Sequence, residues 1–277
     1  MPSVAENVAV WDGNYDWSSG GEEWSGWWGS SDAEWRWTLL PRLSPYLPAR
    51  RASARVLEIA PGFGRWTRFL LPYAERYCGI DLSQECVDAC RQRFAATEHA
   101  RFVRGSGKTL DEVSRSSIDL AFSFDALVHV EADVIESYFQ ELQRVLAPDG
   151  VAFIHHSIAG LHKRHFSWWR EGKFLRARHA LATLTRGLVD RLDHWRGESL
   201  TPVGARQLAA DAGLTVLSQE LFPWGTRRLT DAITVVAHPG SRWTRNGSRT
   251  IVHETRDFMR EAARARAMST LPFHADS

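Results

Sequence analysis

The chain has only three cysteines among its 277 residues, at Cys78, Cys86 and Cys90. Cys86 and Cys90 would share one face of a helix, but no second pair is available to complete a zinc tetrahedron. Three thiols at these positions do not make a disulfide framework either. We therefore expect the cysteines to be buried as small apolar side chains.

The sequence also lacks any long apolar run and any excess of one charge. No stretch approaches the roughly 20 apolar residues that a membrane-spanning helix needs, and residues 1–10 lack the basic and apolar regions of a secretory leader. Lys and Arg number 34 against 33 Asp and Glu, so no net charge attracts the chain to nucleic acid or to a membrane surface. These absences predict a cytoplasmic protein without a membrane or nucleic-acid partner, and they leave its oligomeric state open.

The most informative feature is a strand, a tight loop, a helix and a second strand that ends in an acidic residue. The loop has small residues at Ala60, Gly62 and Gly64, and the second strand ends at Asp81. Small residues let backbone N–H groups approach a ligand, and a carboxylate at the end of the next strand can accept hydrogen bonds from two ribose hydroxyls. The pattern therefore predicts a nucleoside site.

The spacing of the loop separates two kinds of nucleoside cofactor. A dinucleotide-binding loop needs a third glycine three residues after Gly64, where Thr67 stands, so a nicotinamide oxidoreductase is the weaker alternative. Glu58 instead begins an acidic-x-Ala-x-Gly-x-Gly pattern. In these features the segment resembles the class I, Rossmann-like S-adenosylmethionine-dependent methyltransferases. Ala60 replaces the first glycine of that pattern, and we expect it to fit by keeping a negative φ.

This resemblance implies that S-adenosylmethionine is the cofactor. In the family, the acidic residue and the loop serve the methionine half, and the acid after the second strand holds the ribose. The residues assigned to the cofactor are Glu58, Ala60, Gly62, Gly64, Asp81, Leu82, Ser106, Gly107 and Phe124.

Residues 105–109, Gly-Ser-Gly-Lys-Thr, imitate a phosphate-binding loop. Such a loop would need glycine where Phe102 stands, and no apolar helix begins at Lys108, so we reject nucleotide hydrolysis. In methyltransferases this loop borders the adenine ring. Ser106 then occupies the place of the usual Asp.

Predicted strands and helices alternate from about Arg55 onward, which is typical of a parallel sheet covered on both faces. The expected strands cover residues 55–59, 76–80, 100–104, 118–124, 151–154, 215–221 and 231–237. We predict an α/β fold with a seven-stranded, mostly parallel Rossmann-like sheet, helices on both faces, an N-terminal lid and a helical insertion.

The expected organisation has five parts. They are a Trp-rich lid (1–40), the cofactor-binding core (41–160), a helical cap insertion (161–198), the rest of the sheet (199–239) and a C-terminal extension (240–277). The first part holds seven of the 13 tryptophans among Gly, Ser and acidic residues, without helical or strand periodicity. Such a segment does not build a core alone, so we expect it to cover the site, with plain packing on the domain as the alternative.

Catalytic candidates follow the fourth and fifth predicted strands, because ligands of open α/β sheets bind beyond the carboxyl ends of the strands. Methyl transfer to a hydroxyl or an ammonium group needs alignment, exclusion of water and removal of a proton. Histidine suits proton removal near neutral pH, and His129 and His156 are the candidates. Asp125 could orient the base or contact the methionine ammonium. Alternation along the strand sends His155 and His156 to opposite faces, so we expect only His156 of the two to act.

Each candidate also has a structural alternative, since His129 could cap a helix and Asp125 could be a solvated loop acid. Residues expected to contact the acceptor are Tyr15, Trp24, Trp28, His155 and Trp168. The basic stretch at 162–178 is either a solvated helix face or a site for an anionic group. No metal is expected, because the histidines in and before the basic stretch lack carboxylate partners at the spacing of metal ligands.

The sequence thus predicts an enzyme that O-methylates a small-molecule or sugar-containing acceptor with the help of histidine. N-methylation of an amine or amino sugar is the alternative reaction. A non-catalytic S-adenosylmethionine-binding scaffold is the alternative of another class.

Overall fold

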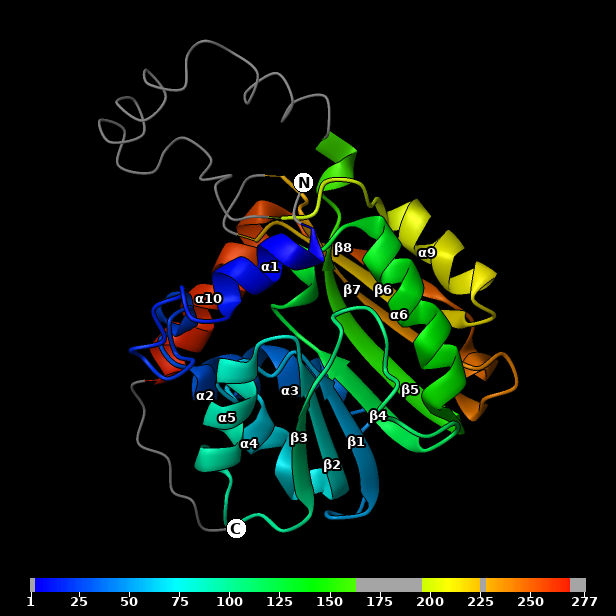
Figure 1. Cartoon of the computed structure of the whole chain (residues 1–277). Coiled ribbons are helices and arrows are strands. Elements are labelled where there is room, and N and C mark those ends of the chain that lie inside the picture. The colour runs from blue at the N-terminus through cyan, green and yellow to red at the C-terminus, as the bar shows by residue number, and fades with distance from the viewer. Residues whose placement is uncertain (1–2, 163–195, 225–227, 270–277) are drawn as a thin grey trace.

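A single mixed sheet of eight strands forms the centre of the molecule (Figure 1). The computed structural model describes residues 3–162, 196–224 and 228–269. The strands are β1 (Ala54–Ile59), β2 (Ala74–Asp81), β3 (Ala100–Arg104), β4 (Ile118–Ser123), β5 (Leu146–Ser157), β6 (Thr215–Phe222), β7 (Asp231–Ala237) and β8 (Arg249–Val252). Their order across the sheet is β3-β2-β1-β4-β5-β7-β6-β8.

The topology confirms the predicted α/β, mostly parallel sheet. Strands β1 to β5 pair in parallel, and β7 lies antiparallel between β5 and β6. The predicted number of seven strands is one too few, because β8 pairs in parallel with the edge of β6. All four residues of β8 are exposed, so this strand has no alternation of buried and exposed positions that a sequence pattern could reveal.

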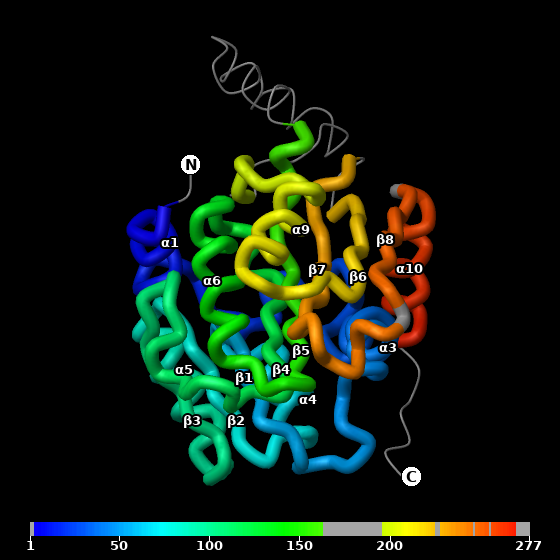
Figure 2. Tube along the Cα trace, turned by 90° about the vertical axis from the view of Figure 1, so that its right-hand side faces the viewer, coloured from blue at the N-terminus to red at the C-terminus, as the bar shows by residue number. Residues whose placement is uncertain are grey.

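Helices cover both faces of the sheet because consecutive residues of each strand point to opposite sides. On β4, Leu120 and Phe122 pack into the core on one face, whereas Ala121 packs into the core on the other. The first face is covered by α3 (Leu40–Leu43), α4 (Thr67–Leu70), α5 (Gln84–Arg93) and α10 (Thr255–Ser269). The second is covered by α6 (Ala132–Val145) and α9 (Pro202–Asp211), which lie side by side in Figure 2.

The helix starts follow local capping chemistry. Ser83 precedes α5, and its hydroxyl accepts a hydrogen bond from the Cys86 N–H at 3.2 Å. Thr201 caps α9 in the same way, and Pro202 stands at the first helical position, where its missing N–H has no partner to lose. The helix expected after the glycine loop is short, because turns occupy residues 62–66 before α4 begins at Thr67.

The N-terminal residues do not form a separate body. They include α1 (Val4–Trp11) and α2 (Ser31–Glu34), and α2 packs against α10 from the C-terminal extension. Most of the predicted cap insertion, including Trp168, lies outside the described residues. Within the described part of the chain, no helix combines the length and the apolar character that crossing a membrane requires.

Candidate active site

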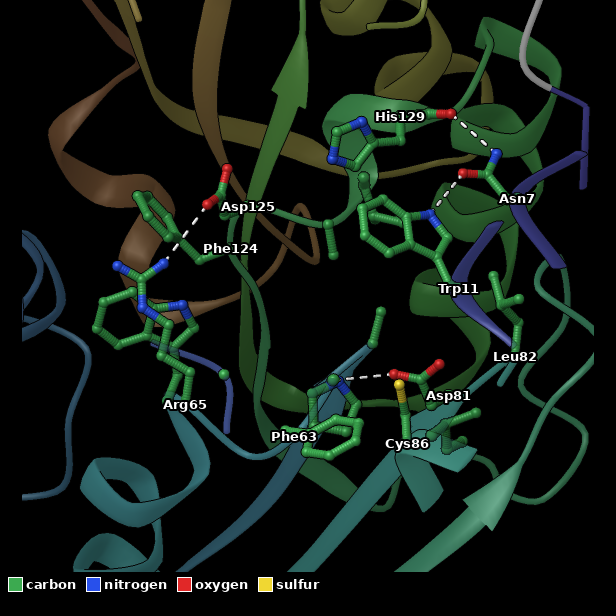
Figure 3. A pocket seen from close by; sticks show the side chains of 18 of the residues that line it. Asn7, Trp11, Phe63, Arg65, Asp81, Leu82, Cys86, Phe124, Asp125 and His129 are labelled. Atoms are coloured by element: carbon green, nitrogen blue, oxygen red, sulfur yellow. Dashed lines mark hydrogen bonds and ion pairs between the residues drawn. The ribbon is translucent and has the colours of Figure 1, made fainter. Parts of the chain in front are cut away.

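A cavity lies beyond the carboxyl ends of β1, β2 and β4 (Figure 3). The loop after β1 and the end of β2 form one wall, and residues 124–130 after β4 form another. The N-terminal segment contributes Asn7, Trp11, Trp17 and Trp24 to the lining. Segments far apart in the sequence therefore meet at the sheet edge where the sequence predicted a ligand.

Asp81, the last residue of β2, lines this cavity and is held by two backbone groups. Its Oδ2 accepts from the Gly62 N–H at 3.0 Å, and its Oδ1 accepts from the Ser83 N–H at 2.9 Å. Burial raises the pKa of Asp81 to about 6, although these N–H groups oppose the shift. Each carboxylate oxygen has further acceptor capacity, which is what two ribose hydroxyls require.

The glycine loop depends on backbone conformations with positive φ. Gly62 has φ 56°, and a Cβ there would lie 3.4 Å from the Trp17 ring. Gly64 has φ 80°, and a Cβ there would lie only 2.5 Å from Phe94, so this glycine serves packing beneath the cavity. Ala60 also has a positive φ, 57°, and the expected negative φ is therefore wrong.

Glu58 lies beneath the loop and is not among the residues that line the cavity. It is 1% exposed, and its Oε2 accepts from the Thr67 hydroxyl at 2.7 Å and from the Tyr77 hydroxyl. Burial raises the pKa of Glu58 to about 7, although the two hydroxyl donors oppose the shift. This placement supports the loop from below and does not provide the expected contact with a cofactor.

Three of the other residues assigned to the cofactor line the cavity, namely Leu82, Gly107 and Phe124. Ser106 does not belong to this lining. Its side chain is exposed, and its Oγ accepts from the Lys108 and Thr109 N–H groups at 3.1 and 2.9 Å. The Ser106 hydroxyl therefore stabilises its own turn.

Asp125 and Arg65 lie on the side of the cavity away from Asp81 (Figure 3). The Arg65 Nη1 is 3.5 Å from the Asp125 Oδ2, and its Nη2 donates to Glu34. Complete burial raises the pKa of Glu34 to about 8, although the Arg65 guanidinium opposes the shift. Within the described residues, the Nε and Nη1 of Arg65 have no hydrogen-bond partner. Sequence reasoning missed Arg65, for which the only signal is a basic residue directly after the loop.

His129 lines the cavity four residues beyond Asp125 and lies beside Trp11, with ring centroids 5.2 Å apart. Its backbone carbonyl accepts from the Asn7 Nδ2 at 3.0 Å. The Asn7 Oδ1 in turn accepts from the Trp11 Nε1 at 3.1 Å. Helix α1 thus holds the His129 backbone and places an indole beside its imidazole.

The two histidines at the end of β5 are fully buried and do not line the cavity. His156 Nε2 lies 2.8 Å from the Thr234 hydroxyl, and burial lowers the pKa of His156 to about 4. An enclosed imidazole cannot reach a substrate, so the predicted base role of His156 does not fit this placement. The Nδ1 of His155 accepts from the Asp125 N–H at 3.0 Å, so the expected acceptor contact of His155 does not fit either.

The aromatic residues expected to contact the acceptor separate into two groups. Trp24 lines the cavity, and Tyr15 stacks on it with ring centroids 5.4 Å apart. Trp28 is fully buried and packs edge-on against Phe258 of α10, so it belongs to the core. Trp168 is outside the described residues.

The chain has no metal site within its described residues, since no three His, Cys, Asp or Glu side chains gather there as ligands. All three cysteines are buried, as the sequence predicted. Cys86 is one of the residues that line the cavity.

Residues 56–150, which carry the loop, Asp81 and His129, match the model of a protein family described as a methyltransferase domain. The chain carries a class I, S-adenosylmethionine-dependent methyltransferase domain. Over 113 residues it is 34% identical to the biotin biosynthesis bifunctional protein BioHC of Cellvibrio japonicus. That alignment covers 41% of this chain and only 22% of BioHC.

Solved structures with a similar fold are more distant in sequence. An S-adenosylmethionine dependent methyltransferase from Mesorhizobium loti is 20% identical with a TM-score of 0.51, covering 74% of this chain and 97% of that one. A protein from Pyrococcus horikoshii is 19% identical with a TM-score of 0.54, covering 83% and 95%. At these identities the likeness concerns the fold of the methyltransferase domain and not its acceptor.

The residues of the cavity fit S-adenosylmethionine. Asp81 provides a fixed carboxylate for ribose hydroxyls, and Gly62, whose N–H donates to Asp81, places no side chain between the loop and Trp17. At the other side, the Nε and Nη1 of Arg65 have no hydrogen-bond acceptor among the described residues, so the guanidinium can bind the carboxylate of a methionine moiety, and the Asp125 carboxylate can bind its ammonium.

Proposed function

We propose that this methyltransferase domain O-methylates a small-molecule or sugar-containing acceptor, with His129 as the general base. One observation carries the proposal: a single cavity joins Asp81 to a second region that holds Asp125, His129 and indole rings from the N-terminal segment. When bound, S-adenosylmethionine supplies a methyl group on a sulfonium whose leaving group departs neutral, so that side needs no general acid. The protein must therefore align the acceptor, exclude water and accept its proton.

Each of these tasks has a residue in the cavity. His129 is the histidine that lines the cavity in the described part of the chain, and its backbone is fixed by Asn7. Trp11, Trp17 and Trp24 cover the cavity with apolar surface, which supports a lid role for the N-terminal segment. A neutral imidazole at His129 would take the hydroxyl proton as the new bond to carbon forms.

A sugar-containing acceptor is consistent with this lining. Indole faces such as that of Trp24 pack well against the C–H faces of a sugar ring, and Asp125 offers an acceptor for its hydroxyls. The same two features favour N-methylation of an amine as a second candidate, since π faces and a carboxylate also attract an ammonium group. The acceptor is therefore the part of the proposal that most needs a direct experiment.

The first experiment compares the binding of S-adenosylmethionine, S-adenosylhomocysteine and NAD to the purified chain by calorimetry. We expect the first two to bind and NAD not to bind. Labelled methyl transfer is then screened over sugars, glycosides and amines. Binding of NAD alone would overturn the assignment of the loop and of Asp81, whereas cofactor binding without transfer to any acceptor would favour the non-catalytic scaffold.

The role of His129 is tested with His129→Gln, and His99→Gln serves as control because His99 is exposed on a distant turn. Loss of a general base should lower turnover by about 10²- to 10⁴-fold, while the affinity for S-adenosylhomocysteine stays the same. Unchanged turnover of His129→Gln would contradict the assignment. For an amine acceptor, turnover should rise with pH through the pKa of the amine and depend less on His129.

A further inference from the structure

His155 is fully buried outside the cavity, yet it accepts a hydrogen bond from Asp125, which lines the cavity. Its Nδ1 lies 3.0 Å from the backbone nitrogen of Asp125, two residues beyond β4. Asp125 has φ 61°, in the left-handed region. Aspartate adopts this region more readily than most residues other than glycine, but a negative φ is still its usual conformation, so a specific contact helps to maintain it.

The hydrogen-bond partners of His155 define its tautomer. A backbone N–H only donates, so Nδ1 must be the nitrogen without a proton, and the proton of the neutral ring lies on Nε2. The Nε2–H group donates a hydrogen bond to the Asp231 Oδ1 at 3.2 Å. Asp231 is itself fully buried and accepts from the Thr230 hydroxyl at 2.5 Å.

A cation completes the arrangement. The Arg196 Nη1 lies 3.1 Å from the Asp231 Oδ1. Burial alone would raise the pKa of Asp231, but Arg196 and His155 outweigh it and hold this pKa below its usual value. Asp231 therefore stays a carboxylate that can accept a hydrogen bond from the Nε2–H of His155.

The position of Arg196 is fixed by the residue that follows it. The Gly197 N–H donates to the Val128 carbonyl at 2.9 Å, and the Gly197 carbonyl accepts from the Ser157 hydroxyl at 2.6 Å. A Cβ at Gly197 would lie 1.9 Å from the Val130 carbonyl oxygen, so only glycine fits this approach. The end of the insertion is thus joined to the loop that carries His129.

We infer that His155 is a positioning residue: its Nδ1 holds the Asp125 backbone in the left-handed conformation that directs the Asp125 carboxylate to the cavity wall beside Arg65. Asp231 and Arg196 hold His155 in the one tautomer that can do so. The inference concerns how the site is assembled, and it does not depend on the identity of the acceptor.

The test uses nuclear magnetic resonance of the full chain without added ligand. Long-range nitrogen–proton spectra should show His155 as a neutral ring protonated on Nε2, and the Asp125 amide should exchange slowly with solvent. His155→Phe fills the space among Phe124 and Trp224 but offers no acceptor. It should speed exchange of the Asp125 amide about threefold to tenfold, the value of one hydrogen bond.

His155→Asn places a carbonyl oxygen near the position of Nδ1 and should restore much of the protection of the Asp125 amide. Asp231→Asn, which leaves the ring in place, should instead increase the fraction of His155 protonated on Nδ1 and speed the same exchange. The Ala152 amide in β5 is the internal control and should not change in any variant.

Two results would overturn the inference. One is a wild-type His155 protonated on Nδ1, and the other is an Asp125 amide that exchanges equally fast in wild type, His155→Phe and Asp231→Asn. Since no ligand is used, neither result bears on whether the chain transfers methyl groups. Calorimetry with S-adenosylhomocysteine, carried out in parallel, reports on that proposal separately.

Discussion

Replacing Glu58 by Gln should make the protein's stability less dependent on pH. Burial raises the pKa of Glu58 from 4.5 to about 7, so between these values the folded chain holds a proton that the unfolded chain has released. Protonated Glu58 therefore makes its full contribution to the free energy of unfolding below about pH 4.5, and this contribution is lost as pH rises through 7. At about 1.4 kcal/mol per pKa unit, the loss in wild type is about 3 kcal/mol.

Glu58→Gln keeps the size of the side chain and an oxygen acceptor for Thr67 or Tyr77, but it cannot ionise. The free energy of unfolding of the variant, relative to wild type, should rise by about 3 kcal/mol between pH 4.5 and pH 8. Urea unfolding followed by tryptophan fluorescence at several pH values measures this difference. Glu98→Gln removes an exposed carboxylate and should show no such trend.

A difference between wild type and Glu58→Gln that stays constant from pH 4.5 to pH 8 would refute the reasoning. It would mean that Glu58 ionises in the folded state as easily as in the unfolded chain. The two hydroxyl donors would then balance its burial completely.

Three further predictions concern other parts of the chain. Asp81→Asn should weaken S-adenosylhomocysteine binding at pH 8 about tenfold to hundredfold by calorimetry, since hydrogen bonds to a charged group contribute about 1.5–3 kcal/mol. Asn7→Leu removes the donor to the His129 carbonyl and should lower the free energy of unfolding by about 1–3 kcal/mol in urea. The hydrogen bond to Glu220 raises the pKa of His253, so its stabilisation should be present below about pH 6.5 and lost as pH rises through the raised pKa. Urea unfolding of His253→Gln against wild type at pH 6 and pH 9 checks this.

The sequence predicted that Gly62 and Asp81 lie close together, because their placement depends on local features. The spacing from the loop at Gly62 to Asp81 is that of one strand, one loop and one helix, and both residues line the cavity. The parallel pairing of β1 to β5 also follows from the alternation of apolar strands and helices. These features need no knowledge of which distant segments cover the sheet.

The acceptor side was less predictable because depth of burial depends on distant segments. Alternation along β5 gave the directions of His155 and His156, but both rings are enclosed. Phe124, Phe222 and Trp224 pack around His155, and the Thr234 hydroxyl lies beside His156. Trp28 looked like part of a recognition surface, yet α10 packs over it from more than 200 residues away in the sequence. Arg65 was missed because its partner Glu34 belongs to the N-terminal segment.

The clearest difference between sequence and structure lies in two residues with positive φ, Ala60 and Asp125. Each follows the end of a central strand, and each donates its N–H to the neighbouring strand: Ala60 to the Ile80 carbonyl at 2.7 Å, and Asp125 to His155 at 3.0 Å. Local preference alone would keep both residues at negative φ. The neighbouring strand therefore selects the conformation, and at Asp125 the position of cavity atoms depends on a partner outside the cavity. For this reason we expect substitutions at His155, outside the cavity, to alter the site as directly as substitutions within it.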